Sequence, residues 1–250
     1  MSGNRRAVLL HGQPGAGAAW HRVVRALDDS IETIAPDRPG YGQNPRAAGG
    51  IHDNVEWLIE LLRTGDAPTV VVAHSWAGGV ALELARRRPD LLSGLVLLAS
   101  VGPGAISVFD RVLTLPIVGP ALMRPMFVAG EPVVRRLVTR DVRDPETREE
   151  LLASMDASRG REVWRTFLVE QASLVADMSA VVDDLGSIAT PTVVVAGTKD
   201  RVVPFATARR LSEALPDARL VAVDGAGHML QRSHPEVVAE AVRQAFAAAR

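Results

Sequence analysis

The feature that most constrains the fold is an alternation between short runs of β-branched or leucine-rich residues and longer segments with helical spacing. We predict strands at residues 7–12, 31–37, 69–75, 92–100, 191–200 and 218–225. Helices are predicted at about residues 17–28, 51–64, 77–88, 204–214 and 235–249. Parallel strands need long crossover connections, which are usually helices. This order therefore predicts an α/β fold with a mostly parallel sheet of about six strands and helices on both faces.

One interval interrupts this alternation between the fourth and fifth predicted strands. Residues 102–188 hold helix-like segments broken by Gly and Pro and rich in Met, Phe and Leu, without a convincing buried strand. The interval is too long for an ordinary crossover. We predict a helical cap at residues 104–176, inserted after the fourth strand, and a core domain formed by residues 1–103 and 177–250.

Composition excludes several classes of protein. Arg and Lys are scattered and the formal net charge is -1, so we expect neither nucleic acid nor an anionic membrane as a partner. Cysteine is absent, and no apolar stretch approaches the roughly 20 residues that span a bilayer. We expect a cytoplasmic protein, a monomer or homodimer, with a small-molecule substrate. His228 and His234 lack metal-ligand spacing and no H-E-x-x-H motif occurs, so we expect no metal. We also expect no cofactor.

The stretch VVVAHSWAGGVALELARRRP, residues 70–89, places Ser75 where a predicted strand turns into a helix. The residues around Ser75 are small, which lets the two arms of a sharp turn approach each other. Two interpretations are open. Ser75 can cap the helix, or it can be a nucleophile held above the sheet, where the first N–H groups of the helix stabilise an oxyanion.

Four motifs together resemble those of the α/β-hydrolase family. AHSWA is similar to the nucleophile elbow G-x-S-x-G, with alanine at both glycine positions. LLHGQPG (9–15) resembles the oxyanion loop, GTKDRVVP (197–204) the acid loop and GAGHMLQRSHPE (225–236) the histidine loop. Each motif follows a predicted strand, and the order of serine, acid and histidine along the chain is the order found in the family.

The resemblance implies a serine hydrolase with a catalytic triad. Ser75 would be the nucleophile, His228 the general base and Asp200 the residue that orients it, with an oxyanion hole formed by the backbone N–H groups of Gln13 and Trp76. HSWAGG also resembles the HDWGG of epoxide hydrolases and dehalogenases, which use an aspartate nucleophile. Serine in its place favours acyl transfer, and we expect cleavage of a small, largely apolar carboxylic ester or lactone through an acyl-enzyme.

Several alternatives stay open. The same triad serves C–C bond hydrolases and cofactor-free perhydrolases, and a non-catalytic protein can bind a small ligand in the same pocket. Asp110 is an alternative acid, although it lies farther along the chain than the family's position after the fourth strand. A dinucleotide site in LLHGQPGAG is disfavoured because the glycine spacing does not fit G-x-G-x-x-G.

The remaining expectations concern the pocket and supporting residues. The cap is expected to select apolar groups, with a pocket lined by Met123, Phe127, Trp164, Phe167 and Met229. Supporting structural roles are predicted for His11, His74 and the loop DRPGYGQN (37–44). Ser233 is predicted to cap the last helix, with Pro235 in its first turn. We also expect the sheet to lack the N-terminal hairpin with which many members of the family begin.

Overall fold

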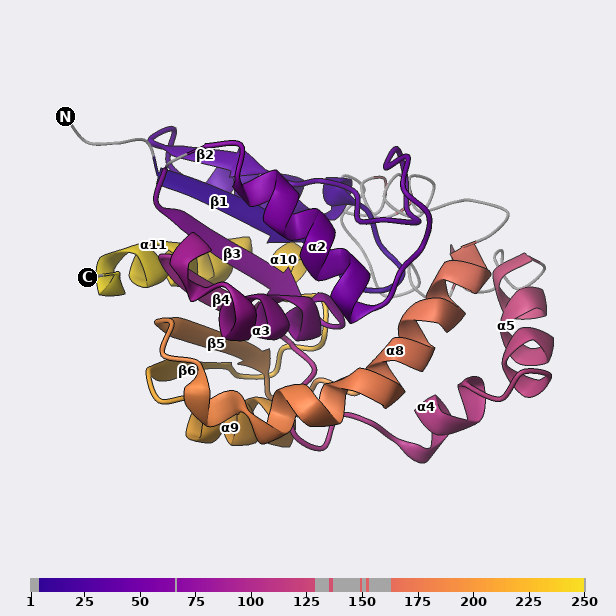
Figure 1. Cartoon of the computed structure of the whole chain (residues 1–250). Helices are drawn as coiled ribbons and strands as arrows, with labels where there is room; N and C mark the ends of the chain where they lie inside the picture. Colours follow the sequence, from indigo (N-terminus) through magenta and orange to yellow (C-terminus); the bar gives the residue numbers. More distant parts are fainter. Residues whose placement is uncertain are drawn as a thin grey trace.

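The computed structural model describes residues 5–65, 67–128, 135–136, 149, 152 and 163–249. In this part of the chain six parallel strands form one sheet in the order β2-β1-β3-β4-β5-β6 (Figure 1). The strands are β1 (Arg5–Leu10), β2 (Ile31–Ile34), β3 (Thr69–His74), β4 (Gly94–Leu98), β5 (Thr192–Gly197) and β6 (Ala218–Val223). Each strand lies within or close to its predicted range, and the predicted α/β fold class is confirmed.

Alternate residues of the central strands serve two separate hydrophobic cores. In β1, Val8 and Leu10 belong to the core on one face of the sheet, whereas Ala7 and Leu9 belong to the core on the other. The strands β3, β4 and β5 divide in the same way, and their residues are buried on both sides. Burial on both faces explains why these strands are continuous apolar runs rather than alternating patterns.

Helices cover both faces, as predicted. One core includes residues of α2 (Ile51–Leu62), α3 (Ala77–Arg87) and α9 (Phe205–Ala214). The other includes residues of α1 (His21–Ala26) and α11 (Pro235–Ala248). Short helical turns complete the described core: η1 (Gly17–Trp20), η2 (Pro89–Leu91), η3 (Leu185–Ser187) and α10 (Leu230–Ser233). None of the described helices has the length and apolar character needed to cross a membrane.

The start of α11 corrects one prediction. His234, not Ser233, occupies the position before the helix, and Pro235 is in its first turn as predicted. Ser233 lies in α10, where its hydroxyl donates a hydrogen bond to the carbonyl of Met229. The prediction that Ser233 caps α11 is wrong, because the preceding loop ends in a helical turn that places this side chain one turn too early.

The segment after β4 is helical, which confirms the predicted insertion. Its described helices are α4 (Val108–Leu113), α5 (Val118–Val128) and α8 (Val163–Asp183). Figure 1 shows α4, α5 and the first half of α8 beyond the edge of the sheet toward which the strand arrows point. The helix α8 continues past residue 176 and packs against α2 and α3, so the predicted domain boundary falls inside this helix. The insertion thus stands over the carboxyl ends of the strands and is joined to the core by one continuous helix.

Candidate active site

The turn between β3 and α3 holds Ser75 in an uncommon backbone conformation. Its φ is +56°, in the left-handed region, which costs a non-glycine residue on the order of 1–2 kcal/mol. The backbone around it is closely tied, since its N–H donates to the carbonyl of Leu98 at 2.9 Å and its carbonyl accepts from Gly78 N–H at 3.0 Å. A Cβ atom on Gly78 would lie 1.8 Å from Ser100 Oγ, so the helix can start here only with glycine. The turn therefore fixes the position of the Ser75 side chain.

His228 and Asp200 form a hydrogen-bonded chain with this serine. His228 Nε2 lies 3.0 Å from Ser75 Oγ, and His228 Nδ1 lies 2.8 Å from Asp200 Oδ2. The Asp200 side chain is fully buried, and its Oδ1 accepts hydrogen bonds from the N–H groups of Val202 and Val203 at 2.8 and 3.0 Å. A carboxylate can only accept, so Nδ1 carries the proton and Nε2 is free to accept one from the serine. This geometry suits removal of the Ser75 proton.

The parallel sheet is what brings these three residues together. Ser75 follows β3, Asp200 follows β5 and His228 follows β6, and the carboxyl ends of parallel strands lie at one edge. The alternative acid, Asp110, is placed elsewhere: its Oδ2 accepts from the N–H and hydroxyl of Ser107 at the start of α4. Of the two candidate acids, Asp200 is the one in contact with His228.

The loop after β1 lies directly against the serine. A Cβ atom on Gly12 would lie 2.9 Å from Ser75 Cβ and 2.9 Å from His74 Nδ1, so only glycine permits this approach. The next residue, Gln13, and the residue after the serine, Trp76, are the predicted oxyanion donors. Among the described loops and turns, neither backbone N–H donates to a backbone acceptor. Gln13 thus follows a residue that approaches Ser75 closely, and Trp76 adjoins the serine in the chain; their role as oxyanion donors stays a prediction.

His74 supports the loop that carries His228. The two imidazole rings are 4.7 Å apart, and His74 Nε2 donates to the backbone carbonyl of His228 at 3.0 Å. Burial lowers the pKa of His74 well below its usual value, and the positive charge that His228 can carry lowers it further. His74 therefore stays neutral and keeps the single donor that the carbonyl needs, which fits the predicted structural role.

Both predicted oxyanion residues are also tied by their side chains to one turn of α8. Trp76 Nε1 donates to the carbonyl of Glu170 at 2.9 Å, and Gln13 Nε2 donates to Gln171 Oε1 at 2.7 Å. The Gln171 amide in turn donates to Asp110 Oδ1 at 2.6 Å. Because the Asp110 carboxylate only accepts, it fixes the direction of both amides in this chain. The insertion is thus fastened directly over the residues beside Ser75.

A buried ion pair makes a third link between the core and α8. Arg38, in the predicted structural loop, donates to Glu170, and the hydroxyl of Tyr41 donates to Glu170 Oε2 at 2.7 Å. Both charged side chains are fully buried. Burial raises the pKa of Glu170, while the guanidinium opposes this shift. Sequence reasoning recognised the loop but missed this pair, because its partners are 132 residues apart and no local pattern joins them.

The five residues predicted to line the pocket occupy the insertion and the histidine loop. Met123 of α5 is buried, and the rings of Phe127 and Phe167 lie 5.6 Å apart where α5 packs on α8. Trp164 is half-buried on α8, and Met229 is 39% exposed directly after His228. The structure brings Phe127 and Phe167 together, and the lining of a pocket by this set stays a prediction.

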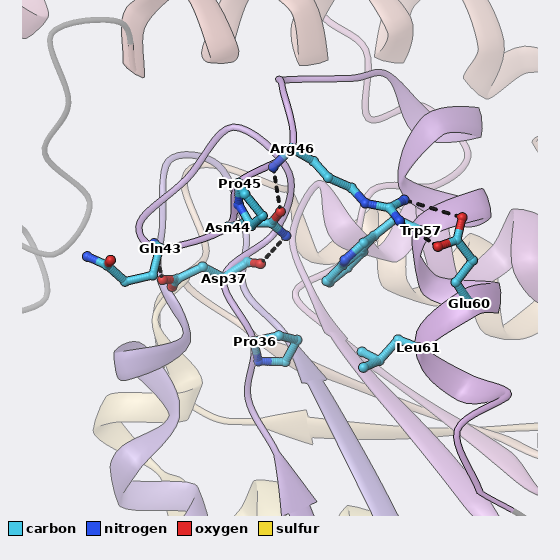
Figure 2. A pocket seen from close by; sticks show the side chains of 9 residues that line it. All are labelled: Pro36, Asp37, Gln43, Asn44, Pro45, Arg46, Trp57, Glu60 and Leu61. Atoms are coloured by element: carbon cyan, nitrogen blue, oxygen red, sulfur yellow. Dashed lines mark hydrogen bonds and ion pairs between the residues drawn. The ribbon is translucent and has the colours of Figure 1, made fainter.

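A separate hollow of about 440 Å³ lies beside α2 and the loop after β2 (Figure 2). Figure 2 shows Arg46 paired with Glu60 across its rim, and Asn44 Nδ2 donating to the carbonyl of Asp37 at 2.8 Å. The carboxylate of Asp37 has a structural role, since it accepts a hydrogen bond from the N–H of Gly17 at 2.8 Å. None of the predicted site residues lines this hollow.

Comparisons with known proteins agree with this architecture. The sequence model of the alpha/beta hydrolase family matches residues 7–241. Lipase LipV of Mycobacterium tuberculosis is 35% identical over 256 residues, covering 97% of this chain and 93% of the relative. A 2-hydroxymuconate semialdehyde hydrolase of Pseudomonas putida is 27% identical, covering 97% of this chain and 87% of its own.

A solved structure shows the same fold. The thermophilic esterase of Thermogutta terrifontis superposes with a TM-score of 0.75 at 23% identity, covering 100% of this chain and 92% of the esterase. The family model matches nearly the whole chain. The parallel sheet and its helical insertion agree with this match. The chain belongs to the alpha/beta hydrolase family.

Proposed function

We propose that the protein is a serine hydrolase that cleaves a small, largely apolar carboxylic ester or lactone through an acyl-enzyme. The observation that carries the proposal is the continuous chain from Ser75 Oγ through His228 to Asp200, at 3.0 and 2.8 Å. A serine hydroxyl is a weak nucleophile at neutral pH and needs such a base. A structural cap at a helix start would need no histidine partner.

In the proposed first half-reaction, His228 Nε2 takes the hydroxyl proton as Ser75 Oγ attacks the carbonyl carbon. Asp200 stabilises the imidazolium, and the N–H groups of Gln13 and Trp76 donate to the oxyanion. His228 then gives the proton to the departing alkoxide, leaving an acyl-serine. In the second half-reaction water attacks the acyl carbon as its proton passes to His228; the bond to Ser75 Oγ then breaks, His228 returns the proton to this oxygen, and the acid is released. One preorganised oxyanion donor contributes about 3–4 kcal/mol to lowering such a barrier.

The choice of an ester is supported by the relatives and by the insertion. The 35% identity with a lipase over nearly the whole chain favours acyl transfer. The apolar residues of α5 and α8, in an insertion that α8 ties to Gln13 and Trp76, favour an apolar substrate. C–C bond hydrolysis on the same triad is the second candidate, because a 2-hydroxymuconate semialdehyde hydrolase is 27% identical over 97% of this chain.

A fluorophosphonate probe tests the nucleophile. The wild-type protein should be labelled once, and Ser75→Ala should abolish labelling and lower kcat on acyl esters by about 10⁴- to 10⁶-fold. Ser100→Ala is the matched control, since Ser100 is a buried serine near the same turn whose hydroxyl donates to the carbonyl of Val101. Labelling of Ser75→Ala at the wild-type rate would refute the proposal.

A panel of purified acyl esters, lactones and C–C bond substrates then separates the candidate reactions. The proposal predicts steady turnover of an ester or lactone at a kcat/KM at least about 10-fold above that for any C–C bond substrate. Preference for a C–C bond substrate would favour the second candidate. Saturable ligand binding without turnover of any of them would indicate a binding protein.

A further inference from the structure

The peptide unit that joins Gly12 to Gln13 is held from its carbonyl side by two buried donors. The carbonyl of Gly12 accepts from Arg38 Nη2 at 3.0 Å and from His11 Nδ1 at 2.8 Å. Arg38 Nε also donates to the carbonyl of His11 at 2.7 Å. The guanidinium thus holds two consecutive carbonyl groups of this loop in a fixed fork, which lysine could not reproduce.

The same peptide unit carries the N–H of Gln13, one of the two proposed oxyanion donors. In a trans peptide the C=O and N–H point in opposite directions. Fixing the Gly12 carbonyl on the Arg38 side therefore fixes the direction of the Gln13 N–H on the other side. Donation to the carbonyl also polarises the amide, so that its N–H becomes a stronger donor.

The protonation of His11 is set by the same arginine. The backbone N–H of Arg38 donates to His11 Nε2 at 3.0 Å, which leaves the proton on Nδ1, facing the Gly12 carbonyl. Burial lowers the pKa of His11 well below its usual value, and the charge of Arg38 lowers it further. A neutral His11 with this tautomer is what the second hydrogen bond to Gly12 requires.

The charge on Arg38 is balanced from the insertion. Glu170 of α8 pairs with it, and Asn54 Oδ1 accepts from Nη1 at 3.2 Å, in a site where both charged groups are fully buried. The guanidinium also lies 4.6 Å from the centre of the ring of Trp76, the other proposed oxyanion residue. Arg38 therefore contacts the Gly12 carbonyl, which belongs to the peptide of one proposed oxyanion donor, and the ring of Trp76, which carries the other. It also contacts Glu170 of the insertion.

We propose that Arg38 is a positioning residue that orients and polarises the Gly12–Gln13 peptide as an oxyanion donor, and that Glu170 holds Arg38 in place from the insertion. This inference rests on the proposed serine hydrolase function. It gives the insertion a role in transition-state stabilisation, in addition to any role in selecting the substrate.

The test compares kcat, KM and the Ki of a trifluoromethyl ketone, which forms a tetrahedral adduct with the serine. In Arg38→Lys, kcat should fall about 10- to 100-fold and Ki should rise by the same factor, because both depend on the oxyanion. KM should change less than about 3-fold. Arg46→Lys is the matched control, because Arg46 lies in the same loop but pairs with Glu60 at the surface, and its constants should stay at the wild-type values.

A second variant covers the case in which Arg38→Lys does not fold. The double variant Arg38→Gln with Glu170→Gln removes both buried charges together, so that neither is left unpaired. It should show the same parallel loss in kcat and Ki. A folded variant of either kind with unchanged kcat and Ki would overturn the inference, as would a fall in kcat without a matching rise in Ki. A wild-type protein that neither reacts with fluorophosphonate nor turns over an ester would instead refute the proposed function.

Discussion

At the scale of single residues, the environment of Ser75 depends on two histidines that must remain neutral. His11 donates to the Gly12 carbonyl and His74 to the His228 carbonyl, each through one ring nitrogen. Burial lowers the pKa of both imidazoles well below the usual value. Protonating either ring would place an unpaired charge in a buried site, so folding opposes it.

These pKa shifts predict how stability depends on pH. The unfolded chain binds a proton at each histidine below about pH 6.5 while the folded protein does not, so the free energy of unfolding should decrease as the pH falls below that value. Each histidine should account for about 1.4 kcal/mol between about pH 7.5 and pH 5.5. Between these two pH values, the free energy of unfolding of His74→Gln, measured with urea, should decrease by about 1.4 kcal/mol less than that of the wild-type protein.

The exposed His52 supplies the control for this measurement. Its side chain is 58% exposed, so His52→Gln controls for the replacement of a histidine at the surface. If His74→Gln and the wild-type protein lost the same free energy of unfolding between the two pH values, His74 would not be buried in the neutral form.

Replacing Asp200 tests the orientation of the general base. Asp200→Asn should lower kcat by about 10³- to 10⁴-fold, because an amide favours the wrong tautomer of His228. Asp110→Asn should leave kcat within about 10-fold, since Asp110 contacts Ser107 and Gln171 rather than the histidine. Steady-state kinetics with one ester would check both. Near-full activity of Asp200→Asn together with inactivity of Asp110→Asn would assign the acid to the insertion.

The positions of Ser75, Asp200 and His228 could be predicted because each follows a strand of a parallel sheet and lies in a motif that resembles one of the family. The sheet alone brings such positions to one edge. The Arg38–Glu170 pair could not be predicted, because it depends on how α8 settles onto the core. Sequence spacing carries no information about a contact between residues 132 positions apart.

At the scale of elements, α8 is the structural bridge between insertion and core. Its middle turn pairs Glu170 with Arg38 and Gln171 with Gln13, and the helix also packs with η3 and α3. The helix has no break at residue 176, the boundary suggested by the sequence. Composition could predict a helical insertion, but not that its last helix would be shared with the core.

This continuity changes how the selectivity of the insertion should be tested. Replacing residues 107–162 with a Gly/Ser linker would remove α4 and α5 but keep α8, with Glu170 on Arg38. Labelling of Ser75 by a small fluorophosphonate should persist, while KM for bulky apolar esters should rise at least about 10-fold more than for acetyl esters. The comparison requires a folded variant, checked by circular dichroism. Unchanged selectivity would show that the removed segment does not choose the substrate.

Replacing residues 104–176 instead removes Glu170 and leaves Arg38 buried without its partner. An uncompensated buried charge costs about 3–5 kcal/mol, so this longer replacement should unfold at a markedly lower denaturant concentration than the replacement of 107–162. Equal midpoints for the two variants would contradict the bridging role of α8.

At the scale of the whole molecule, a mostly parallel sheet of about six strands with helices on both faces could be predicted from periodicity, whereas the strand order β2-β1-β3-β4-β5-β6 comes from the structure. The apolar runs of β3, β4 and β5 are buried on both sides, which gives them an unmistakable pattern. By contrast, β6 has every residue half-buried or exposed, so its prediction rests on its content of Val and Leu. The position of the insertion over the site could be expected from the resemblance, whereas the contacts that fasten α8 to Gln13, Trp76 and Arg38 required the structure.

The central claim is that acyl transfer passes through Ser75, and mass spectrometry of the quenched reaction tests it most directly. With a slowly hydrolysed activated ester, the tryptic peptide of residues 64–86 should gain the mass of one acyl group, and fragmentation should place it on Ser75. The modification should decay at the rate of turnover. Turnover of the ester with this peptide unmodified, or with the acyl group on another residue, would contradict the account.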